Sequence, residues 1–143
     1  MGSSKAKFEE RLGLEEWFNS QGWTPHAFQR ATWKAYRSGA EGLVQAPTGM
    51  GKTYSLLGAA VAEAVLDDRP RKGLQVIWIA PIRSLSKEIE QSAQRLIQGA
   101  GLDWRVGVRT GDTTSAERAK QNRNLPQVLI TTPESLHLLL ARK

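Results

Sequence analysis

The chain has 143 residues, the length of one domain with a single hydrophobic core. Its 40% apolar content is typical of a globular protein, and no apolar run approaches the roughly 20 residues that span a bilayer. The lack of cysteine excludes disulfides and thiolate metal sites and suits a cytoplasmic location. With 20 Lys and Arg against 14 Asp and Glu, the net charge of +6 favours polyanions such as nucleic acid, but charge alone does not identify a partner.

Two helical patterns occupy the N-terminal part of the chain. Residues 8–19 carry apolar side chains at helical spacing and predict an N-terminal helical extension over residues 1–22. Thr24 and Pro25 then resemble an N-cap and a first-turn proline. A second helix is therefore expected to start after Thr24 and to stop at Gly39.

A glycine-bearing turn follows, between residues 42–45, which have strand character, and residues 54–66, which have helical spacing. This context is typical of a phosphate-binding loop, whose backbone N–H groups point at one spot beside a helix N-terminus. The predicted loop comprises Ala46, Pro47, Thr48, Gly49, Met50, Gly51, Lys52 and Thr53. Lys52 is expected to reach the β- and γ-phosphates, and Thr53 to place its hydroxyl on Mg²⁺. An ordinary strand-to-helix turn is the alternative.

Strands and helices alternate along the rest of the chain. Strands are predicted at 74–80, 104–108 and 128–130. Helices are predicted from Leu85 to about Gly99, from Thr114 through Asn122, where Thr114 and Glu117 form a capping box, and from Pro133 onward. The nearly continuous apolar run at 74–80 indicates a strand buried on both faces. The alternation implies an α/β fold with a parallel sheet covered by helices on both faces.

Several loops occur in a characteristic order along the chain. They are Gln29 after Thr24-Pro25, the loop 46–53, Ala-Pro-Ile-Arg-Ser-Leu at 80–85, Thr-Gly-Asp at 110–112 and Thr-Thr-Pro-Glu-Ser-Leu at 131–136. In this order they resemble the first RecA-like P-loop NTPase domain of superfamily-two helicases. Residues 109–113 and 131–143 most closely resemble the ligase-associated DEXH-box DNA helicases of the large helicase-related group. The resemblance covers the chain from about Trp17 onward.

The resemblance implies an ATP site. Gln29 would read the adenine edge, because its amide offers one donor and one acceptor. An upstream aromatic residue would stack on the base, and Trp17, Phe18 and Trp23 are the candidates, with core packing as the alternative for each. Lys52 and Thr53 would be the catalytic residues of this segment, with Thr53 as the Mg²⁺ ligand.

The resemblance also implies three loops that grip one nucleic-acid strand through its phosphates. The expected DNA-binding residues are Arg83, Thr110, Gly111, Asp112, Thr132, Pro133 and Glu134. An ordinary turn at 110–112 and ordinary helix capping at Thr132 are the alternatives. Arg118 and Arg123 are expected on a solvated face.

A working helicase of this type also needs an Asp-Glu-x-His motif after the next strand and a second RecA-like domain with an arginine finger. The sequence contains no Asp-Glu-x-His. We therefore expect residues 23–143 to be a first RecA-like domain that is incomplete at its C-terminal end, and to be inactive alone. The expected parent is an ATP-dependent helicase or translocase on single-stranded DNA, or on RNA in a hybrid, working in DNA repair beside a DNA ligase and a nuclease. Another P-loop ATPase or kinase and a non-catalytic nucleic-acid-binding module are the alternatives.

Overall fold

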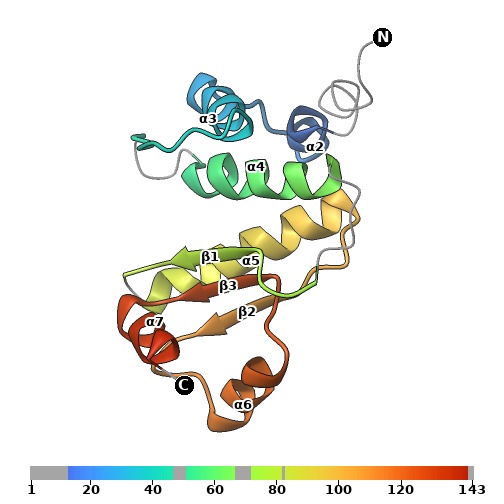
Figure 1. The fold of residues 1–143 in the computed structure, drawn as a ribbon. Helices are drawn as coiled ribbons and strands as arrows, with labels where there is room; N and C mark the ends of the chain where they lie inside the picture. Colours follow the sequence, from blue (N-terminus) through green and yellow to red (C-terminus); the bar gives the residue numbers. More distant parts are fainter. Residues whose placement is uncertain (1–12, 47–50, 67–71, 82, 142–143) are drawn as a thin grey trace. The chain divides into compact units, whose positions relative to one another are not determined.

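The computed structural model describes residues 13–46, 51–66, 72–81 and 83–141 (Figure 1). These residues divide into two compact units. One comprises the described residues up to 69 together with Gln98–Leu102, and the other comprises those of 70–97 and those from Asp103 onward. None of the helices in the described ranges combines the length and the hydrophobicity that crossing a bilayer requires.

The first unit is helical and contains α2 (Leu14–Ser20), α3 (Ala27–Arg37) and α4 (Lys52–Leu66). The predicted helix at 8–19 corresponds to α2, and its residues 8–12 lie outside the described residues. α3 packs against α4, and the buried side chains of α4 include Leu57, Val61 and Ala64. These apolar residues recur at helical spacing, so one stripe of α4 forms the core of this unit.

The start of α3 differs from the expectation, because the N-cap is His26 and not Thr24. The cause is Gln29, whose Oε1 accepts a hydrogen bond from the His26 N–H at 2.8 Å, as the third residue of a capping box does. The end of α3 agrees with the expectation. Gly39 has a φ of +82° and donates its N–H to the Tyr36 carbonyl at 3.0 Å, which is the usual glycine C-terminal motif.

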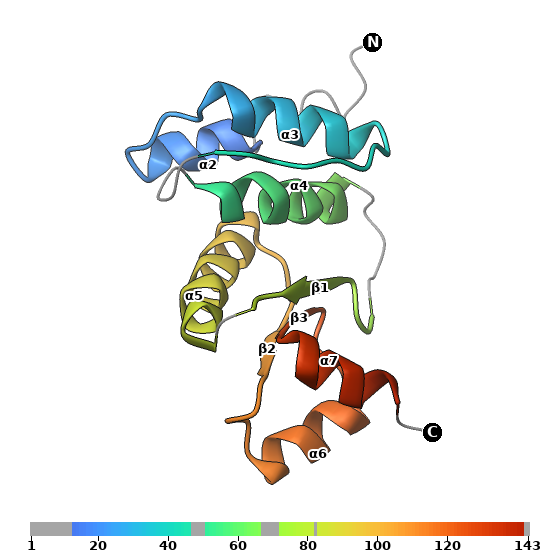
Figure 2. The ribbon, with the colours of Figure 1, turned by 90° about the vertical axis from the view of Figure 1, so that its left-hand side faces the viewer.

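The second unit is a three-stranded parallel sheet in the order β1-β3-β2. Its strands are β1 (Val76–Ile79), β2 (Val106–Arg109) and β3 (Val128–Thr131), and every residue of the central strand β3 is buried. α5 (Arg83–Ala100) and α7 (Pro133–Leu140) lie on opposite sides of the sheet, and α6 (Ser115–Arg123) follows β2 (Figure 2). The predicted parallel α/β sheet with helices on both faces is confirmed.

Two expectations about strands are wrong. Residues 42–45 form no strand in the described part of the chain, and the side chain of Leu43 is 82% exposed. Apolar composition favours a strand, but a strand also needs a neighbour with which its backbone can pair. The outer strand β1 is not buried on both faces, since Ile77 and Ile79 are 44% and 50% exposed. Side chains alternate between the faces of a strand, and at this edge of the sheet one face is only half covered.

Replacement of Thr114 tests the boundary of α6. Its hydroxyl accepts a hydrogen bond from the Glu117 N–H at 3.2 Å, as the capping box predicts. Thr114→Ala should cost about 1 kcal/mol of stability, and Tm should fall by roughly 4 °C for a domain of this size. Thr114→Ser keeps the acceptor and should retain most of the Tm in thermal unfolding followed by circular dichroism. Equal Tm values for the two variants would contradict the capping assignment.

Candidate nucleotide and nucleic-acid sites

A pocket of about 430 Å³ lies in the first unit, where α3 meets the start of α4. Its lining residues are Phe18, Trp23, Thr24, His26, Gln29, Gly51 and Tyr54. The lining therefore combines aromatic rings with a few polar groups, which is the usual composition of a site for a flat heterocyclic ligand.

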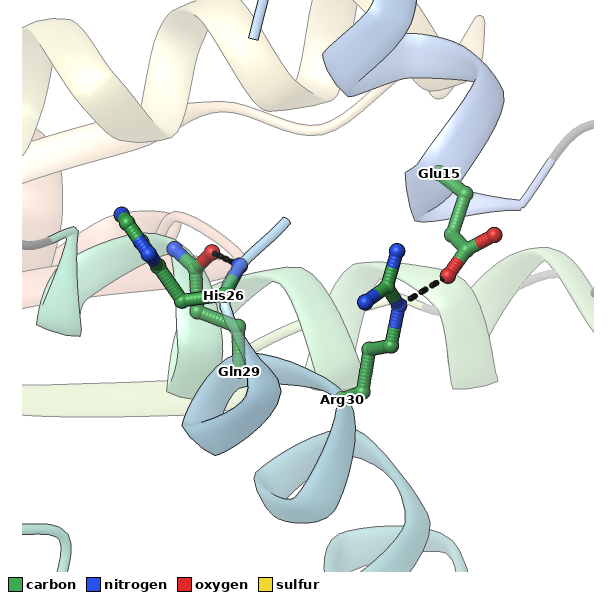
Figure 3. A network of polar contacts seen from close by, with 4 residues as sticks. All are labelled: Glu15, His26, Gln29 and Arg30. Carbon is green, nitrogen blue, oxygen red and sulfur yellow. Dashed lines mark hydrogen bonds and ion pairs between the residues drawn. The ribbon is translucent and has the colours of Figure 1, made fainter. Parts of the chain in front are cut away.

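Gln29 joins this pocket to the phosphate-loop segment. Its side chain is 2% exposed, and its Oε1 accepts from the His26 N–H at 2.8 Å (Figure 3). Its Nε2 donates to the Gly51 carbonyl at 3.0 Å. Gly51 has a φ of +82°, and a Cβ at this position would lie 2.6 Å from the Gln29 Nε2. The backbone conformation therefore favours glycine at position 51, and a larger residue there would also displace the end of the Gln29 side chain.

These contacts exclude a solvated role for Gln29 and add two functions that the sequence did not indicate. The amide still has a second N–H and a second lone pair, so its predicted contact with adenine stays a prediction. The next residue of α3, Arg30, forms an ion pair with Glu15 of α2 (Figure 3). Both side chains are 50% exposed, so this pair adds little to stability.

The predicted phosphate loop is only partly described. Pro47, Thr48, Gly49 and Met50 lie outside the described residues. Lys52 and Thr53 are the first two residues of α4, and Lys52 is exposed while Thr53 is half-buried. The N-terminus of a helix of 15 residues presents unpaired N–H groups and partial positive charge, which favour an anion.

Five aromatic side chains of the first unit form one cluster, with ring centroids 5.4 to 6.0 Å apart in each contacting pair. They are Trp17, Phe18, Trp23, Trp33 and Tyr54. Phe18 is 3% exposed and lies edge-on to all four of the others, so it packs the core. Of the three predicted stacking candidates, Phe18 and Trp23 line the pocket and Trp17 does not.

Three further residues line this pocket that sequence reasoning did not assign to the site, Thr24, His26 and Tyr54. The signal for Tyr54 was its position directly after Thr53, in the first turn of the helix that follows the phosphate loop. His26 serves as the N-cap of α3.

The three predicted DNA loops meet at one edge of the sheet in the second unit. The strand register pairs Ile79 and Arg109 with Thr131, so all three strands end at the same level. Two bonds tie these ends together: the Ala80 N–H donates to the Thr131 carbonyl at 2.8 Å, and the Thr131 hydroxyl donates to the Arg109 carbonyl at 2.7 Å. The loops follow directly, with Arg83 as the first residue of α5, Thr110, Gly111 and Asp112 after β2, and Thr132, Pro133 and Glu134 at the start of α7.

The two threonines of this group are buried and serve their own loops. Thr110 and Thr132 are 5% and 4% exposed. The Thr110 hydroxyl accepts from the Asp112 N–H at 3.2 Å, and the Thr132 hydroxyl accepts from the Ser135 N–H at 3.4 Å, which confirms Thr132 as an N-cap. Among residues 110–112 and 132–134 of the group, Gly111, Asp112, Pro133 and Glu134 are exposed.

The helix α6 contacts the loop after β2, which corrects the expectation for Arg118. Arg118 is half-buried, and its Nη2 donates to the Thr110 carbonyl at 2.9 Å, so it does not lie on a solvated face. Gln121, one turn later and 3% exposed, donates from Nε2 to the Val108 carbonyl at 3.0 Å. Charge pattern did not show which basic side chain of α6 faces the loop. Arg123 is exposed, as expected.

Comparison with known proteins gives a family and a fold. Residues 26–143 match the DEAD/DEAH box helicase family. The Lhr helicase/uracil glycosylase of Escherichia coli strain K12 is 34% identical over 145 residues, which cover 90% of this chain and 9% of that protein. The ATP-dependent helicase Lhr-Core of Methanocaldococcus jannaschii is 32% identical over 140 residues, which cover 89% of this chain and 17% of that protein. The chain thus spans less than a fifth of the length of these relatives.

Solved structures agree with this assignment. The structure of Mycobacterium smegmatis helicase Lhr bound to ssDNA and AMP-PNP matches with a TM-score of 0.75 and 36% identity, over 89% of this chain and 17% of that one. The yeast splicing factor Prp28 matches with a TM-score of 0.66 at 21% identity, which shows the fold alone. The predicted RecA-like fold class is confirmed, and so is the resemblance to superfamily-two helicases of the large helicase-related (Lhr) group. The predicted ligase association of the subfamily stays a prediction. The family match covers most of the chain, which therefore belongs to the DEAD/DEAH box helicase family.

Proposed function

We propose that this chain is the ATP-binding part of a longer superfamily-two helicase that moves along single-stranded DNA. The observation that carries the proposal is the buried Gln29 amide, which lines an aromatic pocket and bonds the carbonyl of Gly51 at 3.0 Å, one residue before Lys52. A base in this pocket and phosphates at the start of α4 would thus be linked by one side chain. In this proposal, residues 1–22 are a helical extension and 23–143 belong to the first RecA-like domain.

The adenine ring lies against Trp23, which lines the pocket and keeps part of its surface exposed. The triphosphate extends to Lys52 and Thr53 at the N-terminus of α4. The half-buried Thr53 hydroxyl fits a Mg²⁺ ion that is bound together with ATP. When bound, this ion neutralises phosphate charge. The described residues contain no cluster of three or more His, Asp or Glu that could hold a metal ion by itself.

The loops at the carboxyl edge of the sheet contact the DNA phosphates. Support comes from their convergence at one level of three paired strands and from the ssDNA that the Mycobacterium smegmatis relative binds. Thr110 and Thr132 act by shaping their loops, because their hydroxyls are buried and already paired. Gly111 and the start of α7 supply N–H groups to phosphate, and Arg83 supplies charge.

The family resemblance, and not the geometry, supports the finer parts of this proposal. These are a cytoplasmic role in DNA repair, association with a DNA ligase and a nuclease, and action on RNA in a hybrid. A P-loop kinase would instead phosphorylate an acceptor without DNA, and a non-catalytic module would bind DNA equally well with and without nucleotide.

Lys52→Ala in the full-length protein should abolish ATP-dependent unwinding and leave the fold intact. The side chain is exposed, so its removal leaves no buried group unpaired, but it deletes the charge that faces the phosphates. A strand-displacement assay with a fluorescent duplex measures the effect. Lys72→Ala, at another exposed lysine of the described chain, is the matched control. Unwinding at the wild-type rate by Lys52→Ala would reject the nucleotide site.

Trp23→Ala should weaken ATP binding by about tenfold, the order expected for loss of one base–aromatic stack. Trp17→Ala removes a ring from the same cluster that does not line the pocket, and it should change ATP affinity less than about twofold. Calorimetric titration with ATP and with tripolyphosphate separates the two parts of the ligand, because only ATP has a base. A similar loss for both ligands, or for both variants, would argue against stacking on Trp23.

Arg83→Ala should weaken single-strand binding about equally for all sequences, since phosphate contacts carry no base information. It should also lower the slope of log K against log salt by roughly one unit. Fluorescence anisotropy with oligonucleotides of three compositions at several salt concentrations measures both quantities. A loss that depends on sequence, or an unchanged slope, would remove Arg83 from the phosphate contacts.

A further inference from the structure

We propose that Arg118 of α6 is a positioning residue that holds the loop after β2 in the shape that binds a DNA phosphate, with Gln121 as its partner. The loop is residues 110–113, named here the β2 loop. The inference rests on the proposed function, because it requires that the β2 loop contacts DNA. It assigns a role to a helix that none of the predicted site residues occupies.

Three consecutive carbonyls at the end of β2 each receive a hydrogen bond from a side chain. The Val108 carbonyl accepts from the Gln121 Nε2 at 3.0 Å and from the Thr113 hydroxyl at 3.2 Å. The Arg109 carbonyl accepts from the Thr131 hydroxyl at 2.7 Å. The Thr110 carbonyl accepts from the Arg118 Nη2 at 2.9 Å. The end of β2 is therefore held from α6 on one side and from β3 on the other.

The β2 loop is also closed by its own bonds. The Thr110 N–H donates to the Thr113 hydroxyl at 2.9 Å, the Asp112 N–H to the Thr110 hydroxyl at 3.2 Å and the Thr113 N–H to the Thr110 carbonyl at 3.2 Å. Gly111 is exposed, and its N–H has no acceptor within the described part of the chain. The loop thus turns its other N–H groups inward and leaves that of Gly111 for a ligand.

The Arg118 contact is placed to control this arrangement. Its acceptor, the Thr110 carbonyl, also accepts the bond from Thr113 that closes the loop, so one carbonyl oxygen sets both the closure and the orientation of its own peptide plane. The N–H of that same planar peptide is the Gly111 N–H. A hydrogen bond from a charged donor is among the stronger ones available to a neutral carbonyl.

Stability alone does not account for these two side chains. The Nε of Arg118 and the Oε1 of Gln121 are buried and have no hydrogen-bond partner among the described residues. Burial of such atoms is unfavourable, and the two residues lie three positions apart on one face of α6. An apolar residue at either position would avoid this cost, so the polar contacts to the β2 loop are what the arrangement provides. Arg118 is half-buried and its side chain bonds the loop backbone. In this it differs from an exposed arginine that contacts phosphate directly.

The test uses the full-length protein and measures binding of a fluorescent single-stranded oligonucleotide by anisotropy across a salt series. Arg118→Met keeps the apolar stem and removes the donor. We expect it to weaken DNA binding by about tenfold, the order of one charged hydrogen bond, with no change in the salt slope. The DNA concentration that half-stimulates ATP hydrolysis should rise by the same factor while the maximal rate stays near wild type. Arg118→Lys retains a donor and should restore part of the affinity.

Arg123→Met is the matched control, because it removes the same charge from an exposed position of the same helix, and it should change affinity less than about twofold. A salt slope that falls by roughly one unit in Arg118→Met would make Arg118 a direct phosphate contact and overturn the inference. Unchanged DNA affinity with a lowered Tm would make the role structural and also overturn it.

Gly111→Glu separates this inference from the proposed function. The variant places a negative charge on the exposed loop. If it leaves DNA binding unchanged, the β2 loop does not face DNA and the proposed function fails at this loop. If it weakens binding while Arg118→Met does not, only the positioning role fails.

Discussion

The register of the parallel sheet is the constraint on which the proposed DNA-contacting loops depend. β3 pairs with β1 and β2 so that Ile79, Thr131 and Arg109 lie side by side at the carboxyl ends. The fully buried Thr131 hydroxyl bonds the Arg109 carbonyl and thus fixes this level. A shift of one residue would turn Thr131 to the opposite face of the sheet and break its bond to the Arg109 carbonyl, so this bond helps to specify the register. Three loops that are distant in the sequence consequently meet at one edge.

The first unit depends on a different interaction, the double engagement of the Gln29 amide. One end caps α3 at His26 and the other holds the Gly51 carbonyl, so the start of α3 and the start of α4 are fixed by one buried side chain. A ligand that enters the aromatic pocket meets this same side chain. A ligand in this pocket that displaced the amide would also affect the His26 and Gly51 contacts, since an amide with both ends paired cannot move at one end without loss at the other.

Sequence patterns predicted most of the architecture, and the order of short loops led to the helicase family. The strand at 128–130 could be predicted because a central parallel strand is buried on both faces and therefore has a nearly continuous apolar sequence. The lack of a strand at residues 42–45 and the exposure of Ile77 could not be predicted in the same way. Both depend on which neighbouring segment pairs with a strand or covers it. The N-cap at His26 depends on one hydrogen bond, from its N–H to the Gln29 side chain. The orientation of Arg118 likewise depends on one hydrogen bond, from its side chain to the Thr110 carbonyl. Such contacts leave no periodic signal in the sequence.

Photocrosslinking of the full-length protein tests the central claim, that nucleotide and DNA are held by separate sets of these residues. The measurement is peptide mapping after irradiation with 8-azido-ATP and, separately, with single-stranded DNA that carries photoreactive nucleotides. We expect the ATP analogue to label peptides within residues 13–66, around Trp23, Gln29 and Tyr54. DNA should label peptides that contain residues 110–113 and 132–134. Crosslinks of DNA to the aromatic pocket, or of the ATP analogue to the loops at the sheet edge, would contradict it.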